Sequence, residues 1–253
     1  MEAVKIIENV TPSTKIVSYT GVVPSISENV FVAPTASVIG KVHIGKGSSV
    51  WYGAKIRGDV HDIKIGANSS IGDCVMVHSA KIQGDHATSI GDNVTVGSNA
   101  VVHACNIQDN VIVGMGAQIL DGAVVQSYSV IAPGALVTPG KVVSSGQLWS
   151  GSPAKHLRDL TEAEKSAIGT SACQASGLAI VHAEETAKDY LQVMKDEEIA
   201  EDQRIRSDDY LPRLDPELAN IPVSQGGTLP HSYSVNDRKH TSTGGAVTAP
   251  SSL

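Results

Sequence analysis

The feature that most constrains the fold is a branched aliphatic residue that returns every six positions. Seventeen positions between residues 32 and 137 follow this spacing with three breaks. They are Val32, Val38, Ile44, Val50, Ile56, Ile65, Ile71, Val77, Ile90, Val96, Val102, Ile107, Val113, Ile119, Val125, Ile131 and Val137. A period of six matches neither a helical turn nor a simple alternating strand. It predicts a parallel β-helix with hexapeptide sides rather than a sandwich whose short strands share this spacing by chance.

Composition agrees with such a fold and excludes several functions. Aromatic residues make up only 4% of the chain, whereas 24 glycines suit many short strands with tight corners. A net charge of −7 gives no sign of a nucleic-acid binder. The three cysteines, Cys74, Cys105 and Cys173, form no C-x-x-C motif, which favours a reducing compartment. No apolar run reaches membrane-spanning length, and the first twenty residues, with Glu2 and Glu8 and no Arg, do not resemble a transit peptide.

The repeat also predicts which residues stack on one another. Three sides make one coil, so residues about 18 positions apart lie on the same face, apart from short insertions. Ile56, Val77 and Val102 then stack on successive coils, and the residues directly after them are Arg57, His78 and His103. These three polar side chains are therefore expected at one corner of the prism.

Ser98 belongs to the face before this corner, about 120° around a three-sided prism. His78 and His103 can bind one metal ion from within a chain, but Ser98 cannot easily join them. A residue at position 98 would reach such a pair on a neighbouring chain if three prisms packed around a threefold axis.

Four segments carry a resemblance to a known family: VFVAPTASVIGKVHIGKGSSVWYGAKIRGDV, IGDNVTVG, GMGAQILDG and WSGSPAKHLRDLTEAE. They cover about residues 28–165 and resemble the γ-class carbonic anhydrases, in particular the γ-carbonic-anhydrase-like subunits of plant and algal mitochondrial complex I. The resemblance implies an all-β fold, a left-handed parallel β-helix of hexapeptide repeats. A C-terminal α-helix and an extended tail follow it.

The resemblance also implies a metal site that is incomplete in this chain. In active members, three histidines hold zinc at each subunit interface, two from one chain and one from its neighbour. His78 and His103 match the two, whereas Ser98 stands in place of the third. Gly72 stands where the family usually has Gln near the zinc-bound water. One half of the site is therefore expected to be kept and the other lost.

Other residues near this site have more than one interpretation. Arg57 and Asp59 match family residues and have either a catalytic role or a structural one, as an ion pair across the subunit interface. Cys105, close to His103, is expected to pack rather than bind metal. His86, in an insertion, is expected to be a solvated loop residue rather than a proton shuttle.

Carbonic anhydrase chemistry needs a metal with three protein ligands and an open position for water. Two histidines are not enough, and a serine hydroxyl is a poor zinc ligand. A homotrimer is therefore expected to be inactive, with zinc bound only where a partner supplies the third histidine.

The resemblance then implies a mainly structural accessory subunit of mitochondrial complex I, in a trimer with related chains. It would lie on the matrix side of the inner membrane, peripheral to the bilayer and against membrane-arm subunits. The alternative is an active γ-carbonic anhydrase that hydrates CO₂ at a site completed by a neighbour. A hexapeptide acyltransferase is a third class, which the four segments match less well.

The sequence predicts four regions along the chain. They are an N-terminal arm (1–27), the hexapeptide-repeat domain (28–160), a C-terminal helical segment (161–206) and an extended or disordered tail (207–253). Thr161 and Glu164 form a capping-box pattern that predicts the helix start. The helical segment is expected to break near Gly177.

Overall fold

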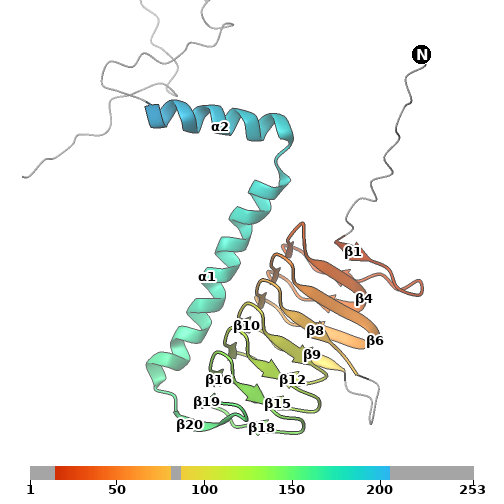
Figure 1. Cartoon of the computed structure of the whole chain (residues 1–253), viewed down its shortest axis with the longest axis vertical. Helices are drawn as coiled ribbons and strands as arrows, with labels where there is room; N and C mark the ends of the chain where they lie inside the picture. Colours follow the sequence, from red (N-terminus) through yellow and green to blue (C-terminus); the bar gives the residue numbers. More distant parts are fainter. Residues whose placement is uncertain (1–14, 81–86, 206–253) are drawn as a thin grey trace, which may run out of the picture. The chain divides into compact units, whose positions relative to one another are not determined.

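A computed structural model describes residues 15–80 and 87–205, and they form the predicted parallel β-helix followed by helices (Figure 1). The first sheet contains β1 (Ile16–Val17), β2 (Ser25–Ile26), β4 (Ser37–Ile44), β6 (Lys55–Ile65), β8 (Met76–His78), β9 (Thr88–Ile90), β11 (Val101–His103), β12 (Asn106–Ile107), β14 (Gln118–Ile119), β15 (Val124–Val125), β17 (Leu136–Val137) and β18 (Val142–Val143). The second contains β3 (Phe31–Val32), β5 (Ser49–Val50), β7 (Ser70–Ile71), β10 (Thr95–Val96), β13 (Ile112–Val113), β16 (Val130–Ile131), β19 (Gln147–Ser150) and β20 (Lys155–Asp159).

The first sheet covers two faces of the prism because β4 and β6 continue around a corner. The first part of β6, at Lys55–Arg57, pairs with β8, whereas its last part, at Ile63–Ile65, pairs with β9. The second sheet forms the third face. All strand pairs are parallel except β19 with β20. Within the predicted N-terminal arm, β1 and β2 pair in parallel with β4.

The core confirms the six-residue repeat. All seventeen repeat residues are buried, and Ile56 pairs with Val77, which pairs with Val102, as the sequence predicts. Burying an aliphatic side chain of this size stabilises a fold by about 1.5–3 kcal/mol. Cys105 also lies in the core, where burial raises the pKa of its thiol to about 12.

The corners need a backbone that most residues avoid. At one corner the same position of five successive coils has a positive φ, and these residues are Gly53, Cys74, Asn99, Gly116 and Gly134. Each amide from Cys74 onward donates to a carbonyl of the coil before, such as Cys74 to Tyr52 (2.9 Å) and Asn99 to Asp73 (2.8 Å). Gly and Asn tolerate this left-handed conformation, but Cys74 does so at a cost of about 1–2 kcal/mol.

Helix α1 (Glu162–Ala187) begins where the capping box predicts, with Thr161 and Glu164 bonding each other's backbone amides. It lies against the outer face of the second sheet and contacts β3, β5 and β7 (Figure 1). The sequence predicts a break near Gly177, and this prediction is wrong. A glycine costs a helix about 1 kcal/mol, but here its neighbours are held, since Ala179 is buried and Ser176 donates to the Gly47 carbonyl (3.2 Å).

The helical segment breaks instead at residues 188–189. Lys188 adopts an extended conformation, and the Asp189 carboxylate accepts a hydrogen bond from the Gln192 amide (2.8 Å). Asp189 thereby caps α2 (Tyr190–Ile205). The unit that contains the β-helix and α1 ends at Met194. No helix in residues 15–80 and 87–205 is long and apolar enough to cross a membrane. The predicted tail, 207–253, lies outside the described residues.

The corner conformation yields a stability prediction. Cys74→Asn should raise the free energy of unfolding by about 1 kcal/mol, because Asn adopts the left-handed conformation at lower cost. Asn99→Cys, at the same corner of the next coil, is the matched control and should lower it by a similar amount. Urea denaturation of both variants measures this. Equal and opposite shifts support the corner argument, and a stability loss in Cys74→Asn contradicts it.

The buried thiol yields a second prediction. Because burial raises its pKa to about 12, Cys105 holds far less thiolate near pH 8 than an exposed cysteine does. Iodoacetamide, which reacts with thiolates, should therefore modify the exposed Cys74 and Cys173 but spare Cys105 in the folded chain. Peptide mass spectrometry with and without urea measures this. Rapid labelling of Cys105 in the folded chain would place it outside the core.

Candidate metal half-site

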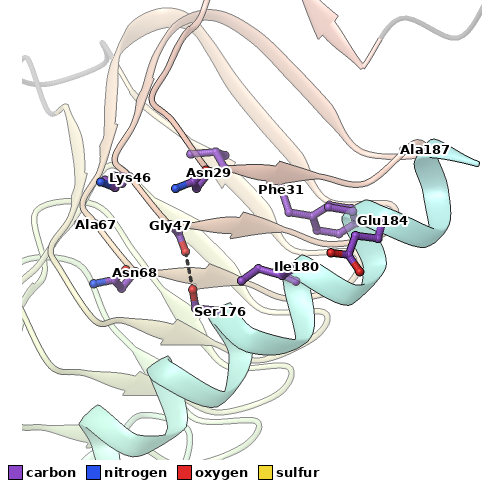
Figure 2. A pocket seen from close by; sticks show the side chains of 13 residues that line it. Asn29, Phe31, Lys46, Gly47, Ala67, Asn68, Ser176, Ile180, Glu184 and Ala187 are labelled. Atoms are coloured by element: carbon purple, nitrogen blue, oxygen red, sulfur yellow. Dashed lines mark hydrogen bonds between the residues drawn. The ribbon is translucent and has the colours of Figure 1, made fainter. Parts of the chain in front are cut away.

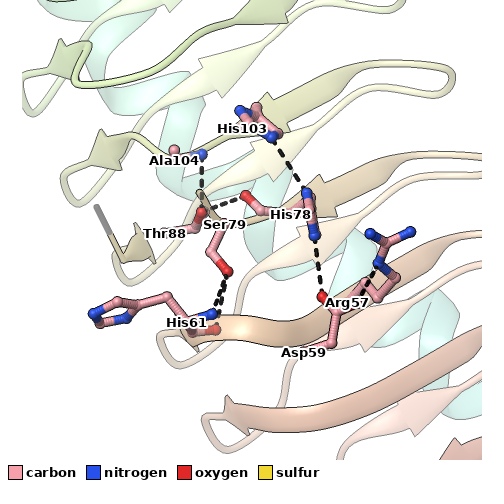
Figure 3. Close-up of polar contacts among 8 residues, drawn as sticks. All are labelled: Arg57, Asp59, His61, His78, Ser79, Thr88, His103 and Ala104. Carbon is pink, nitrogen blue, oxygen red and sulfur yellow. Dashed lines mark hydrogen bonds and ion pairs between the residues drawn. The ribbon is translucent and has the colours of Figure 1, made fainter. Parts of the chain in front are cut away.

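Two histidines face each other at the ends of adjacent strands. His78 ends β8 and His103 ends β11, and the parallel pairing sets them directly side by side. The His78 Nδ1 atom lies 3.2 Å from the His103 Nε2 atom, as Figure 3 shows. Arg57 of β6 pairs with His78 on the other side. The structure therefore brings together the three polar residues that the repeat predicts at one corner.

In each imidazole, the nitrogen that faces away from the other ring contacts a carboxylate. The Asp59 Oδ1 atom lies 3.1 Å from His78 Nε2, and the Asp121 carboxylate contacts His103 Nδ1. Carboxylates on the outer nitrogens of histidine ligands are common in metal sites, where they fix the ring orientation and the tautomer. Sequence reasoning missed Asp121. Its one signal is its place two residues after Ile119, the repeat residue that stacks on Val102.

The Asp59 carboxylate has two partners in its own chain, Arg57 and His78. Arg57 Nε lies 2.9 Å from Asp59 Oδ2, so this ion pair forms within one chain. Partial burial by itself raises the pKa of Asp59, but hydrogen bonds from His78 and Arg57 outweigh it and hold the pKa below its ordinary value. Asp59 is therefore ionised at neutral pH and orients His78 as a carboxylate.

The backbone beside His78 is anchored by a buried hydroxyl. Ser79, the next residue, is fully buried, and its Oγ atom lies 3.0 Å from both the amide nitrogen and the carbonyl oxygen of His61 (Figure 3). Strand β8 is thereby joined to β6 just beyond its last residue. His78 has both its strand pairing and this bond to hold its position.

The spacing of the imidazoles fits zinc. Tetrahedral zinc with two nitrogen ligands at 2.0–2.1 Å places those nitrogens about 3.3 Å apart. In this structure His78 Nδ1 and His103 Nε2 share a hydrogen bond of 3.2 Å, close to that spacing, and both remaining nitrogens are paired with carboxylates. Across residues 15–80 and 87–205, no three His, Cys, Asp or Glu side chains group to hold a metal ion. The described chain thus offers two nitrogen ligands at a spacing suited to zinc.

Ser98 follows a strand of the other sheet, away from these histidines. It follows β10 of the second sheet, and its Oγ atom is 3.4 Å from Asp73 Oδ2. Gly72, Asp73 and Ser98 line a cavity of about 470 Å³ that also includes Leu178 of α1. A side chain at Gly72 would clash, because its Cβ would lie 2.7 Å from the Val96 carbonyl oxygen and 2.9 Å from the Ser98 amide.

A larger hollow of about 790 Å³ lies between α1 and the corner of the first coils (Figure 2). Small and apolar residues dominate its walls, including Ala179 and Ile180, with Lys46 and Glu184 among the polar ones. None of the half-site residues lines it. The chemistry of the corner at His78 and His103 is therefore separate from this hollow. His86 lies outside the described residues.

Comparison with known proteins identifies the family, although no protein-family model matches the chain. The chain is 43% identical over 207 residues to gamma carbonic anhydrase 1, mitochondrial, of Arabidopsis thaliana, which covers 79% of this chain and 75% of the relative. It is also 43% identical over 190 residues to gamma carbonic anhydrase 2, mitochondrial, of the same plant, covering 74% of this chain and 68% of the relative.

A solved structure agrees on the fold. The crystal structure of a hexapeptide transferase family protein from Anaplasma phagocytophilum superposes with a TM-score of 0.62 at 43% sequence identity, covering 65% of this chain and 95% of that one. The repeat, the stacked histidines and the level of identity lead to one conclusion. The chain belongs to the γ-carbonic anhydrase family.

Proposed function

We propose that this chain is an accessory subunit of mitochondrial complex I that forms a trimer with related γ-carbonic-anhydrase chains. In that trimer it supplies one zinc half-site, His78 with His103, and lacks the third ligand because position 98 is a serine. The observation that carries the proposal is the 3.2 Å spacing of two imidazole nitrogens with both outer nitrogens on carboxylates.

The mitochondrial location in this proposal is supported by the names of the relatives. Those named above are mitochondrial by name. We place this chain on the matrix side of the inner membrane, peripheral to it and against the membrane-arm subunits of complex I. This part of the proposal comes from the family resemblance.

Because the site is divided between chains, the composition of the trimer determines which interfaces have all three zinc ligands. Each interface takes two histidines from one chain and the third ligand from its neighbour. This chain completes the interface to which it brings His78 and His103, provided that the neighbour has a histidine at its equivalent of position 98. The interface to which it brings Ser98 lacks one ligand. In a mixed trimer, the number of complete sites therefore equals the number of partner chains with all three histidines.

The enzymatic alternative uses the same geometry. A zinc ion held by three protein ligands would lower the pKa of a water to about 7 and so would supply a hydroxide nucleophile for CO₂ near neutral pH. Within this chain, His78 and His103 would hold the ion, Asp59 and Asp121 would orient their rings, and Arg57 would keep Asp59 ionised. A mixed interface would then hydrate CO₂, whereas the homotrimer would serve as scaffold only.

The proposal predicts that one substitution restores a site in the homotrimer. Ser98→His should bring zinc to about one ion per chain, because it returns the third nitrogen ligand. The wild type and the control Ser98→Ala should hold almost none, and the double variant His78→Ala with Ser98→His should lose what the single one gains. Gly72 is left unchanged, because a side chain there would clash.

Metal analysis of dialysed, size-selected trimers and a CO₂ hydration assay measure these outcomes. Zinc at one ion per chain in the wild-type homotrimer would show that another residue replaces the missing ligand. A trimeric Ser98→His variant without zinc would show that the two imidazoles do not form a competent half-site.

A further inference from the structure

We propose that Thr88, through its buried hydroxyl, is a positioning residue that sets the separation of His78 and His103. This inference rests on the proposed function, because it concerns the same half-site. Thr88 is the first residue of β9, and its hydroxyl bonds backbone atoms. It acts through the backbone of both histidine strands.

The hydroxyl joins the two strands where they end. Thr88 Oγ1 donates to the His78 carbonyl oxygen at 2.6 Å and accepts from the Ala104 amide at 3.1 Å, as Figure 3 shows. The Ala104 amide also donates to the His78 carbonyl oxygen at 2.9 Å. The three groups therefore form a closed set of hydrogen bonds that links the His78 carbonyl to the residue directly after His103.

A hydroxyl is costly at this point in the prism. Thr88 pairs with Ile63, which pairs with Val42, so its neighbours along this inner face are aliphatic. Thr88 is fully buried. A buried hydroxyl without partners costs about 1–3 kcal/mol. Valine has the same shape and would serve the core without that cost. The Thr88 hydroxyl instead makes two hydrogen bonds, one to the His78 carbonyl oxygen and one to the Ala104 amide that follows His103.

The backbone after His103 needs such a restraint. Ala104 has a φ of 47°, a left-handed conformation that costs a residue with a side chain about 1–2 kcal/mol. Without a fixed amide, residue 104 would relax toward an ordinary φ and rotate the backbone that carries His103. Holding the Ala104 amide with two acceptors keeps the His103 ring toward His78, at the spacing that zinc requires.

The chain offers a matched control. Thr95 lies in β10 of the second sheet, and its Oγ1 atom is buried without a hydrogen-bond partner among the described residues. Thr95→Val therefore makes the same change of atoms as Thr88→Val without removing a hydrogen bond. A general effect of placing valine in this β-helix would appear in both variants.

The metal experiment uses the full chain with Ser98→His, with zinc affinity measured by competition with a chelator. Adding Thr88→Val should weaken zinc binding by about 10–100-fold, the usual effect of losing an outer contact to a metal ligand. Thr88→Ser keeps the hydroxyl and should restore most of the affinity, and Thr95→Val should leave it unchanged. A folded Thr88→Val variant with unchanged zinc affinity would overturn the inference.

A second readout needs no metal and uses the chain with Ser98 intact. Nuclear Overhauser contacts between the His78 and His103 rings, whose centroids lie 5.3 Å apart, report their separation. The rate of hydrogen exchange at the Ala104 amide reports how firmly its two acceptors, Thr88 Oγ1 and the His78 carbonyl oxygen, hold this amide. Both the Overhauser contacts and the protection of the Ala104 amide should weaken in Thr88→Val and persist in Thr88→Ser and Thr95→Val.

If Thr88→Val does not fold, fast exchange of the Ala104 amide in the wild type would itself overturn the inference. If Ser98→His binds no zinc, the proposed function fails, while this arm still tests Thr88.

Discussion

The whole candidate site depends on the in-register parallel pairing of β8 with β11. Because each coil repeats the inward aliphatic residue, Val77 and Val102 stack in the core and the next residues, His78 and His103, stack outside it. The hydrophobic repeat thus places two imidazole side chains on adjacent strands. Carboxylates contact the outer nitrogens of both rings, and the facing nitrogens lie 3.2 Å apart.

The same geometry explains why the site has two separable halves. His78 and His103 end strands of the first sheet, whereas Ser98 follows a strand of the second. A change at position 98 therefore leaves the histidine pair and its carboxylates intact. Gly72, beside Ser98, has no room for a side chain. In the proposed trimer, a chain built in this way can lose its contribution to one interface and keep its contribution to the other.

The sequence predicted the stacking that follows from the repeat. It did not predict which side chains bond one another or the backbone of a neighbouring coil. The pairing of Arg57, His78 and His103 follows from counting, because the repeat residue before each of them stays buried despite the insertions between coils. Asp121 lies two residues after Ile119, which stacks on Val102, so the repeat places it in the next coil but does not show that its carboxylate contacts the His103 ring. Thr88 bonds backbone atoms, so no pattern of side chains marks its role. The helix through Gly177 survives because packing outweighs a local propensity.

The most direct test is native mass spectrometry of trimers co-assembled from this chain and a relative with all three histidines. The method separates trimers by composition and weighs the metal in each. The account predicts that a trimer loses one zinc ion for every copy of this chain, down to none in the homotrimer. Zinc at full occupancy whatever the composition would contradict it, and so would zinc that is lost at both interfaces of a single copy.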